Sequence, residues 1–430
     1  LFMDPAETRW RSAGPADLER LFGTPAPTWA VAQRVLEASP EMARSLLARS
    51  DDLLAAVRQV LSAEIAPLGA LVPSWRNRPR RLAIVRSFAS QLFSEEPWPA
   101  TTWLEGNLVH CGVPFDIVWD EDLDADPGAL AGYRLVAVSG ASCLTRPMAE
   151  ALTRFQSAGG VVVTDAETRV DLPGAILVQA GDPAAPTTLP YRPAGAAEPP
   201  QPPLDGLALA GPADPEVMSL VERCLDPEAR ALSPFTWLNL LEAEGACYLG
   251  IVNDLRVHGP LYGHFDRVRE TGGAQTARVA IQPHLGAVAY DLVRHEAVPL
   301  RRSGALLMAD LALGPGEGRA LVLLPAAIAR LDLQAGLQAA EWGDHRGRQI
   351  ALRAGLFDAE GRIVPGVVPA TVTLIHPDGS RNDLSHHGAF RRGLLETALP
   401  IPVNAPPGPW RVRVREHAGG RLAEAAVSVR

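Results

Sequence analysis

A cysteine between a strand and a helix is the first residue in this sequence that could carry out chemistry. Cys143 lies in VAVSGASCLTRPM (136–148), a stretch typical of a buried strand that runs into the start of a helix. Nucleophiles in open parallel sheets lie beyond the carboxyl ends of the strands, and the N-terminus of a following helix lowers the pKa of a thiol. One interpretation is a hydrolase or amidotransferase-like enzyme that uses Cys143, with Asp165 or Glu167 nearby.

The residues around Cys143 argue against that interpretation. The sequence SGASC is neither a Gly-x-Ser-x-Gly elbow nor its cysteine counterpart, and His110, at the end of a predicted helix, is placed to cap that helix. A catalytic triad is recognised by the roles of its members, and two of those roles are unfilled. We therefore expect Cys143 to fill space between the strand and the helix.

A second candidate site lies in NDLRVHGPLYGHFDRVRE (253–270), which contains Asp254, His258, His264 and Asp266. Two imidazoles and two carboxylates could bind a divalent metal ion, but their spacing matches no standard site. A polar loop at the tip of a long β-hairpin, or an interface, explains the same residues. We favour that explanation and expect neither a metal nor another cofactor.

The four cysteines show no Cys-x-x-Cys pair and no zinc-site spacing. Each lies in or beside an apolar run, which favours small buried side chains. A disulfide between Cys224 and Cys247 is left open by the sequence, because pairing depends on geometry.

The composition excludes several functions. All forty basic residues are arginine, which excludes Schiff-base chemistry and a phosphate-binding-loop lysine. The net charge of -9 argues against nucleic acid and anionic membrane surfaces as partners. No stretch approaches the roughly 20 apolar residues of a membrane span.

The first 75 residues are predicted to be helical. Ser39 is placed as an N-cap before Pro40, and apolar residues then recur with helical spacing on one side until Pro67. A one-sided helix needs a partner surface, so we expect a protein partner or a homo-oligomer. The following Pro- and Arg-rich stretch PSWRNRPRR (73–81) could bind an anion, but it is interpreted as a solvated linker.

Residues 81–180 are predicted to form an α/β domain. Short runs rich in Val and Ile alternate with helical patterns, which is typical of an open parallel sheet covered on both faces. Residues 181–215 are so rich in proline that we expect a linker or an extended insertion. The runs interpreted as strands are RLAIVRSF (81–88), FDIVWDEDL (115–123), YRLVAVSG (133–140) and VVVTD (161–165).

The rest of the chain is predicted to be all-β. After a short helical stretch, apolar residues alternate with a period of two between Gly, Pro and Asp turns, as in CYLGIVNDLRV (247–257) and RALVLLP (319–325). A second such series includes GPWRVRVRE (408–416). We expect two β-sandwiches, over 216–335 and 345–430.

The α/β segment carries a family resemblance. The stretch GVPFDIV (112–118), the strand YRLVAV (133–138) and the unit FQSAGGVVVTD (155–165) resemble the glutamine-amidotransferase-like, or β-galactosidase trimerisation, domain of family-42 glycoside hydrolases. The resemblance covers about 100 residues and implies a flavodoxin-like sheet of the class I amidotransferase type. In that class the nucleophilic cysteine follows the strand that corresponds to GGVVVTD, where this sequence reads DAETR (165–169).

The resemblance therefore implies a degenerate, non-catalytic version of the domain. The two sandwiches resemble accessory β-domains of large bacterial carbohydrate-active proteins, the second of an Ig-like or macroglobulin-like kind. A family-42 enzyme also needs an eightfold barrel with two catalytic carboxylates, for which the residues before 81 are too few. Other carboxylates that could be nominated as acids are interpreted as parts of solvated loops; these are Glu95, Glu96, Glu105 and Asp120–Asp124.

We expect a non-catalytic structural, oligomerisation or interaction module of a bacterial carbohydrate-associated or cell-envelope protein. It would be the C-terminal part of a larger glycosidase-like protein, with a catalytic domain or a signal peptide upstream. A scaffold subunit of a larger complex is an alternative. Carbohydrate is a candidate ligand, and an extracytoplasmic location is slightly favoured over the cytoplasm.

Overall fold

The fold is taken from a computed structural model, which describes residues 58, 61–93, 102–179, 213–262, 267–342 and 345–430. The chain divides into two compact units, Leu1–Gly69 and Ala70–Arg430. In the first unit the described elements are a π-helical turn, η3 (Leu61–Ile65), and α4 (Ala66–Leu68). Most of the predicted N-terminal helix and the Pro-rich segment up to 212 lie outside the described residues.

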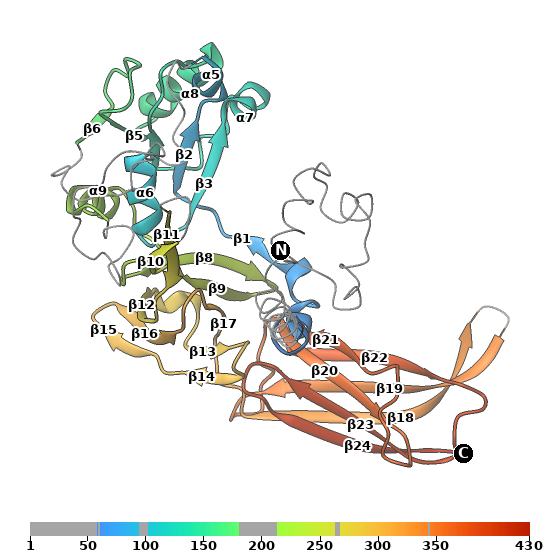
Figure 1. The fold of residues 1–430 in the computed structure, drawn as a ribbon. Coiled ribbons are helices and arrows are strands. Elements are labelled where there is room, and N and C mark those ends of the chain that lie inside the picture. Colours follow the sequence, from blue (N-terminus) through green and yellow to red (C-terminus); the bar gives the residue numbers. More distant parts are fainter. Residues whose placement is uncertain (1–57, 59–60, 94–101, 180–212, 263–266, 343–344) are drawn as a thin grey trace, which may run out of the picture. The chain divides into compact units, whose positions relative to one another are not determined.

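A five-stranded parallel sheet forms the centre of the α/β part of the second unit (Figure 1). Its order is β3-β2-β4-β5-β6, so the first strand of the sheet lies between the second and the third. The strands are β2 (Leu82–Arg86), β3 (Phe115–Trp119), β4 (Leu135–Val138), β5 (Val161–Asp165) and β6 (Ile176–Val178). The helices are α5 (Phe88–Phe93), α6 (Trp103–His110), α7 (Asp120–Ala125), α8 (Arg146–Ser157) and α9 (Pro215–Cys224).

Helices cover both faces of this sheet, as the apolar strand runs require. Alternate residues of each strand point to opposite faces, so Ile84 packs with α6 and α9, whereas Val85 packs with α7 and α8. Helix α9 follows the Pro-rich segment and inserts Val217, Leu220 and Val221 into the core of the α/β part.

Two antiparallel sheets then enclose one apolar core between them. The six-stranded sheet contains β1 (Arg76–Asn77), β8 (Thr236–Ala243), β9 (Ala246–Asn253), β17 (Gly318–Leu324), β13 (Val288–Asp291) and β14 (Glu296–Val298). The four-stranded sheet contains β15 (Arg301–Ser303), β16 (Leu306–Leu313), β12 (Gln275–Ile281) and β7 (Ala229–Ala231). A separate hairpin joins β10 (Arg256–Tyr262) and β11 (Arg267–Gly272), and the 3-10 turns are η4 (Val72–Ser74) and η6 (Pro283–Leu285).

A second pair of antiparallel sheets completes the chain. One sheet has the order β18-β19-β22 and the other β21-β20-β23-β24. Their buried residues alternate along the strands, and Trp410 is fully buried. The strands are β18 (Arg330–Trp342), β19 (His345–Phe357), β20 (Val368–Ile375), β21 (His386–Phe390), β22 (Leu394–Ile401), β23 (Gly408–Glu416) and β24 (Leu422–Val429).

These elements confirm the expected combination of a mixed α/β part and β-sandwiches. All four cysteines are free, so the disulfide considered between Cys224 and Cys247 is not formed. Among the residues with described positions, none of the helices is long and apolar enough to cross a membrane.

The interpretation of 73–81 as a solvated linker is wrong. Arg76 and Asn77 form β1, which pairs with β8, and the Arg78 side chain lies in a bidentate ion pair with Glu228, at 2.7 and 2.8 Å. The same guanidinium donates to Glu242 at 2.8 Å. The arginines of this stretch therefore fasten the α/β part to the first sandwich through contacts that lie far apart in the sequence.

A glycine provides a second link between the α/β part and the first sandwich. Gly112 has φ of +67° and its carbonyl accepts a hydrogen bond of 2.8 Å from the Ala231 amide. A Cβ at this position would lie 2.5 Å from the Ala231 carbonyl oxygen. Backbone conformation and close approach therefore both require glycine here.

A tyrosine links the two sandwiches. The Tyr248 hydroxyl donates to the Val367 carbonyl at 2.6 Å and accepts from the Val367 amide at 3.1 Å. Burial raises the pKa of Tyr248 well above its ordinary value, although the hydrogen bond with Val367 opposes this. The phenol therefore stays neutral and keeps both hydrogen bonds across the physiological range of pH.

A cluster of imidazoles lies at the same junction. His417 is 6% exposed, and its Nε2 lies 2.7 Å from the Thr371 hydroxyl. His295 bonds to the His417 carbonyl at 3.0 Å, and the two rings lie 4.5 Å apart. Burial, followed by the charges of His295, His387 and Arg415, lowers the pKa of His417 to about 3.

We predict that Gly112→Ala lowers the free energy of unfolding by about 2 kcal/mol or more, since it combines left-handed strain with a steric clash. Gly159→Ala is the matched control, because Gly159 has φ of +91° but nothing within 4 Å of the added Cβ. We expect the control to lose only the cost of placing a residue with a Cβ in a left-handed backbone conformation, about 1 kcal/mol. Equal losses in urea denaturation would show that the close approach to Ala231 is not a constraint.

We also predict that stability falls as the pH drops from about 6.5, the ordinary pKa of histidine, towards 3. In that range His417 binds a proton in the unfolded chain but not in the folded protein. This difference contributes a slope of about 1.4 kcal/mol per pH unit to the free energy of unfolding. Denaturation measured across this range should show a smaller slope for His417→Gln. Equal slopes in His417→Gln and the parent protein would contradict the assignment.

Candidate functional site

The candidate site lies at the carboxyl edge of the parallel sheet, where Cys143 was predicted. The loops after β2, β4 and β5 meet here with the first turn of α6. The polar residues of these loops hydrogen-bond mainly to one another.

Asp165, the last residue of β5, is the centre of this network. It is 2% exposed. One carboxylate oxygen accepts from the Ser139 hydroxyl, and the other accepts from the Gly140 amide at 3.2 Å and from the Thr168 amide and hydroxyl at 3.1 and 2.9 Å. A buried carboxylate needs such donors to offset its lost hydration. Asp165 is therefore committed to holding two loops.

The network continues into α6. The Ser139 hydroxyl also hydrogen-bonds to that of Thr102, which caps α6. Thr102 and Glu105 form a capping box, in which each side chain bonds to the other's backbone amide. The chain of contacts from Asp165 thus fixes the start of this helix.

Glu105 carries a buried charge that is paired. It is 2% exposed, and its two oxygens accept from Nε and Nη2 of Arg86, each at 2.8 Å. The Arg86 guanidinium lies 5.8 Å from the centre of the Trp119 ring. A bidentate pair of this kind offsets the desolvation cost of both charges.

The turn that contains Cys143 is fastened through its backbone. The Cys143 carbonyl accepts hydrogen bonds from Ser87 Oγ at 3.0 Å and from Ser90 Oγ at 2.5 Å. The amides of Ser142 and Cys143 in turn donate to Ser90 Oγ, at 3.1 and 3.0 Å. The Cys143 sulfur lies 3.9 Å from Ser90 Oγ. Within the described ranges, neither a carboxylate nor an imidazole hydrogen-bonds to this sulfur.

Glu167 lies at the exposed rim of the network. Partial burial, followed by the negative charge of Asp165, raises its pKa, and a hydrogen bond from the Trp103 amide opposes this. The structure thus brings Asp165 and Glu167 together, but it does not bring either into hydrogen-bond contact with Cys143.

Two polar atoms at this edge have hydrogen-bonding capacity to spare. Asp120, at 4% exposure, accepts from the Ala89 amide at 3.1 Å through Oδ2, whereas its Oδ1 and the Ser142 hydroxyl are buried without a partner among the described residues. The interpretation of Glu105 and Asp120 as parts of solvated loops is therefore wrong. Glu105 falls in a stretch that was predicted to be helical, and the capping-box spacing from Thr102 to Glu105 was the sequence signal that could have placed it at the start of that helix.

The candidate metal ligands of residues 253–270 lie mostly outside the part of the chain whose side chains are described. Asp254 pairs with Arg256 at 3.2 Å, His258 belongs to β10 but its side chain is not described, and His264 and Asp266 fall outside the described ranges. In the part of the chain that the structure describes, no group of three or more potential ligands could hold a metal ion. The preference for a polar hairpin loop or an interface over a metal site therefore stays a prediction.

We predict that Arg86→Met lowers the free energy of unfolding by about 3 kcal/mol, because it leaves the buried Glu105 carboxylate uncompensated. The double variant Arg86→Met, Glu105→Gln should recover part of this loss, as measured by denaturant unfolding. Arg146→Met is the control, since its ion pair with Glu150 is exposed and should contribute nothing measurable. Additive effects of the two core substitutions would contradict the coupling.

Comparison with known proteins finds glycoside hydrolases at low similarity. No known family profile matches the sequence, and no characterised protein is significantly similar to it. A catalytic mutant of Gan42B, a family-42 β-galactosidase from G. stearothermophilus, is 14% identical with a TM-score of 0.32, over 57% of this chain and 40% of that one. α-L-Fucosidase isoenzyme 2 from Paenibacillus thiaminolyticus is 13% identical with a TM-score of 0.39, over 61% of this chain and 50% of that one. A rhamnosidase from Novosphingobium sp. PP1Y is 10% identical with a TM-score of 0.31, over 81% of this chain and 35% of that one. The chain spans half or less of each of these proteins, and the values are too low to assign a family.

Proposed function

We propose that this chain is a non-catalytic structural and interaction module of a bacterial carbohydrate-associated or cell-envelope protein. In this proposal the α/β part is a degenerate amidotransferase-like domain with a flavodoxin-like sheet, and the two sandwiches are accessory domains, the second of them Ig-like or macroglobulin-like. The module packs against a protein partner or a second copy of itself, next to a catalytic domain of a larger glycosidase-like protein.

The observation that carries this proposal is the state of Asp165. The loop after β5 is where the resemblance would place a nucleophile, and a catalytic loop there needs a group with a free side chain and an adjacent base. Instead, the loop begins with a buried carboxylate that accepts hydrogen bonds from Ser139, Gly140 and Thr168. A residue fixed in this way stabilises the edge, and at 2% exposure it presents almost no surface to a substrate.

The strand order supports the finer assignment of the fold. With its first strand between the second and third, followed by the fourth and fifth, the sheet has the order of flavodoxin-like proteins. The carbohydrate context rests on the family-42 motifs, which fall on β3, β4 and the α8–β5 connection.

The links between the parts support a structural role. Arg78 connects the α/β part to the first sandwich through two carboxylates, and Tyr248 connects the two sandwiches through two hydrogen bonds. Links that are partly buried and geometrically specific favour one arrangement of the parts, which supports a structural role.

The reactivity of Cys143 tests the proposal. We expect iodoacetamide to alkylate Cys143 near neutral pH no faster than it alkylates glutathione, because no base activates the thiol. Peptide mass spectrometry would follow Cys143 against Cys224, a half-buried thiol on α9 whose pKa is raised by burial. Hydrolysis of a panel of nitrophenyl glycosides should be absent in both the parent protein and Cys143→Ala.

Two results would overturn the proposal. The first is alkylation of Cys143 about tenfold faster than that of glutathione, since thiolate content sets the rate of a reactive cysteine. The second is a hydrolase activity that disappears when one residue of this chain is changed. Sizing by light scattering adds a separate check on the oligomer, which does not bear on catalysis.

A further inference from the structure

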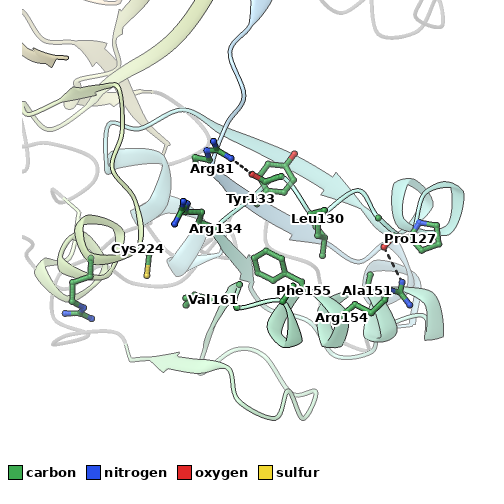
Figure 2. A pocket seen from close by; sticks show the side chains of 17 residues that line it. Arg81, Pro127, Leu130, Tyr133, Arg134, Ala151, Arg154, Phe155, Val161 and Cys224 are labelled. Carbon is green, nitrogen blue, oxygen red and sulfur yellow. Dashed lines mark hydrogen bonds between the residues drawn. The ribbon is translucent and has the colours of Figure 1, made fainter. Parts of the chain in front are cut away.

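A pocket of about 700 Å³ opens at the amino edge of the parallel sheet, the edge opposite Asp165 (Figure 2). Arg81 precedes β2, Arg134 precedes β4 and Gly160 precedes β5, so the starts of three strands form its base. The remaining walls come from the loop 127–133 and from the last turns of α8 and α9. A cavity of this size matches those that bind small molecules.

The pocket gathers positive charge. Four arginines line it, and its seventeen lining residues include no aspartate or glutamate. This concentration is unusual for a chain whose net charge is -9. The four come from separate elements and are Arg81, Arg134, Arg154 and Arg223.

These guanidinium groups are oriented by neutral acceptors, which leave their charge uncompensated. Arg81 donates to the Gly132 carbonyl at 3.0 Å and Arg223 to the Ser219 hydroxyl at 2.8 Å. No carboxylate of the described residues lies within ion-pair distance of Arg81, Arg134 or Arg223.

Arg154 is the one lining arginine with an acidic neighbour. It donates to the Pro127 carbonyl at 3.2 Å and lies 4.0 Å from Glu150. That carboxylate lies closer to Arg146, at 2.8 Å. The acid therefore offsets little of the charge at the pocket.

Compensation of helix dipoles does not account for four cations. Arg154 and Arg223 lie in the last turns of α8 and α9, where a cation stabilises the negative end of a helix. Each terminus carries only about half a negative charge, so two termini offset about one of the four guanidinium groups. Arg81 and Arg134 are not in helices, and their charge is left to attract an anion.

The floor of the pocket is rigid. Phe155 is buried, and its ring lies so close to Gly160 that a Cβ there would approach it to 2.3 Å. Tyr133 presents a second ring, held by a hydrogen bond of 3.0 Å from its hydroxyl to Asp116. Aromatic walls and fixed backbone give a ligand a surface to rest on while the arginines bind its charged groups.

We propose that this pocket binds a small ligand that carries two or more oxyanion groups, such as sulfate, phosphate or carboxylate. Guanidinium groups match these oxyanions with two parallel hydrogen bonds, and arginine keeps its charge at any physiological pH. The inference goes beyond the function proposed above and does not depend on it, since the pocket and the Asp165 network lie at opposite edges of the sheet.

Titration calorimetry at low salt tests the proposal on the full chain. The probes are inositol trisphosphate, for a phosphate ligand, and a trisulfated heparin disaccharide, for a sulfated or carboxylated sugar. Arg134→Gln is the informative variant, because the exposed Arg134 side chain makes no hydrogen bond or ion pair with the described residues that the substitution would remove. We expect it to weaken binding of the preferred probe about tenfold, the loss typical of one charge-assisted hydrogen bond.

Arg302→Gln is the matched control. Arg302 lies on β15 in the first sandwich, is exposed, and its replacement changes the net charge equally. We expect this control to leave affinity unchanged and added NaCl to weaken binding in the parent protein. Preference for one probe identifies the source of the oxyanion. Failure of both probes to bind at millimolar concentration, or equal losses in Arg134→Gln and Arg302→Gln, would overturn the site without affecting the Cys143 test.

Discussion

One buried carboxylate organises the carboxyl edge of the α/β sheet. Asp165 lies at the end of β5 with almost no access to water, so its charge must be matched by protein donors. Ser139 and Thr168 supply donors, and these hydrogen bonds fix the conformations of the loops after β4 and β5. From Ser139 the contacts pass to Thr102 and then, through the capping box, to Glu105. A side chain that could have been read as an acid is thus the anchor of the edge.

The same requirement, that buried charge be matched, explains how the parts of the chain are joined. Arg78 would be an exposed residue of a linker if it had no partners, but its guanidinium binds Glu228, just before β7, and Glu242 on β8. Only glycine fits where the Gly112 carbonyl meets the Ala231 amide. Charge pairing and close backbone approach therefore both contribute to this junction.

Local patterns in the sequence predicted the elements better than they predicted the contacts. The runs that became β4 and β5 are short, apolar and bounded by turn residues, so periodicity was sufficient for them. Helix α9 was recognised as helical, but nothing in its sequence shows which core its apolar side joins. Glu105 and Asp120 were misplaced because a carboxylate looks solvated until its distant partner is known. Arg86 is such a partner for Glu105, and it lies on β2, whereas Glu105 lies in α6.

The two edges of the sheet differ in a way that no local pattern reveals. At the carboxyl edge, Glu105 is paired with Arg86, and the Asp165 carboxylate is stabilised by hydrogen bonds from neutral groups of the protein. At the amino edge, Arg81 donates to a carbonyl and Arg223 to a hydroxyl, while Arg134 has no hydrogen-bond partner among the described residues. Their positive charges are therefore not compensated within this part of the protein. In a chain without lysine, every such cation is a guanidinium that does not lose its proton at physiological pH. The attraction for anions at this edge is therefore permanent, and salt rather than pH sets its strength.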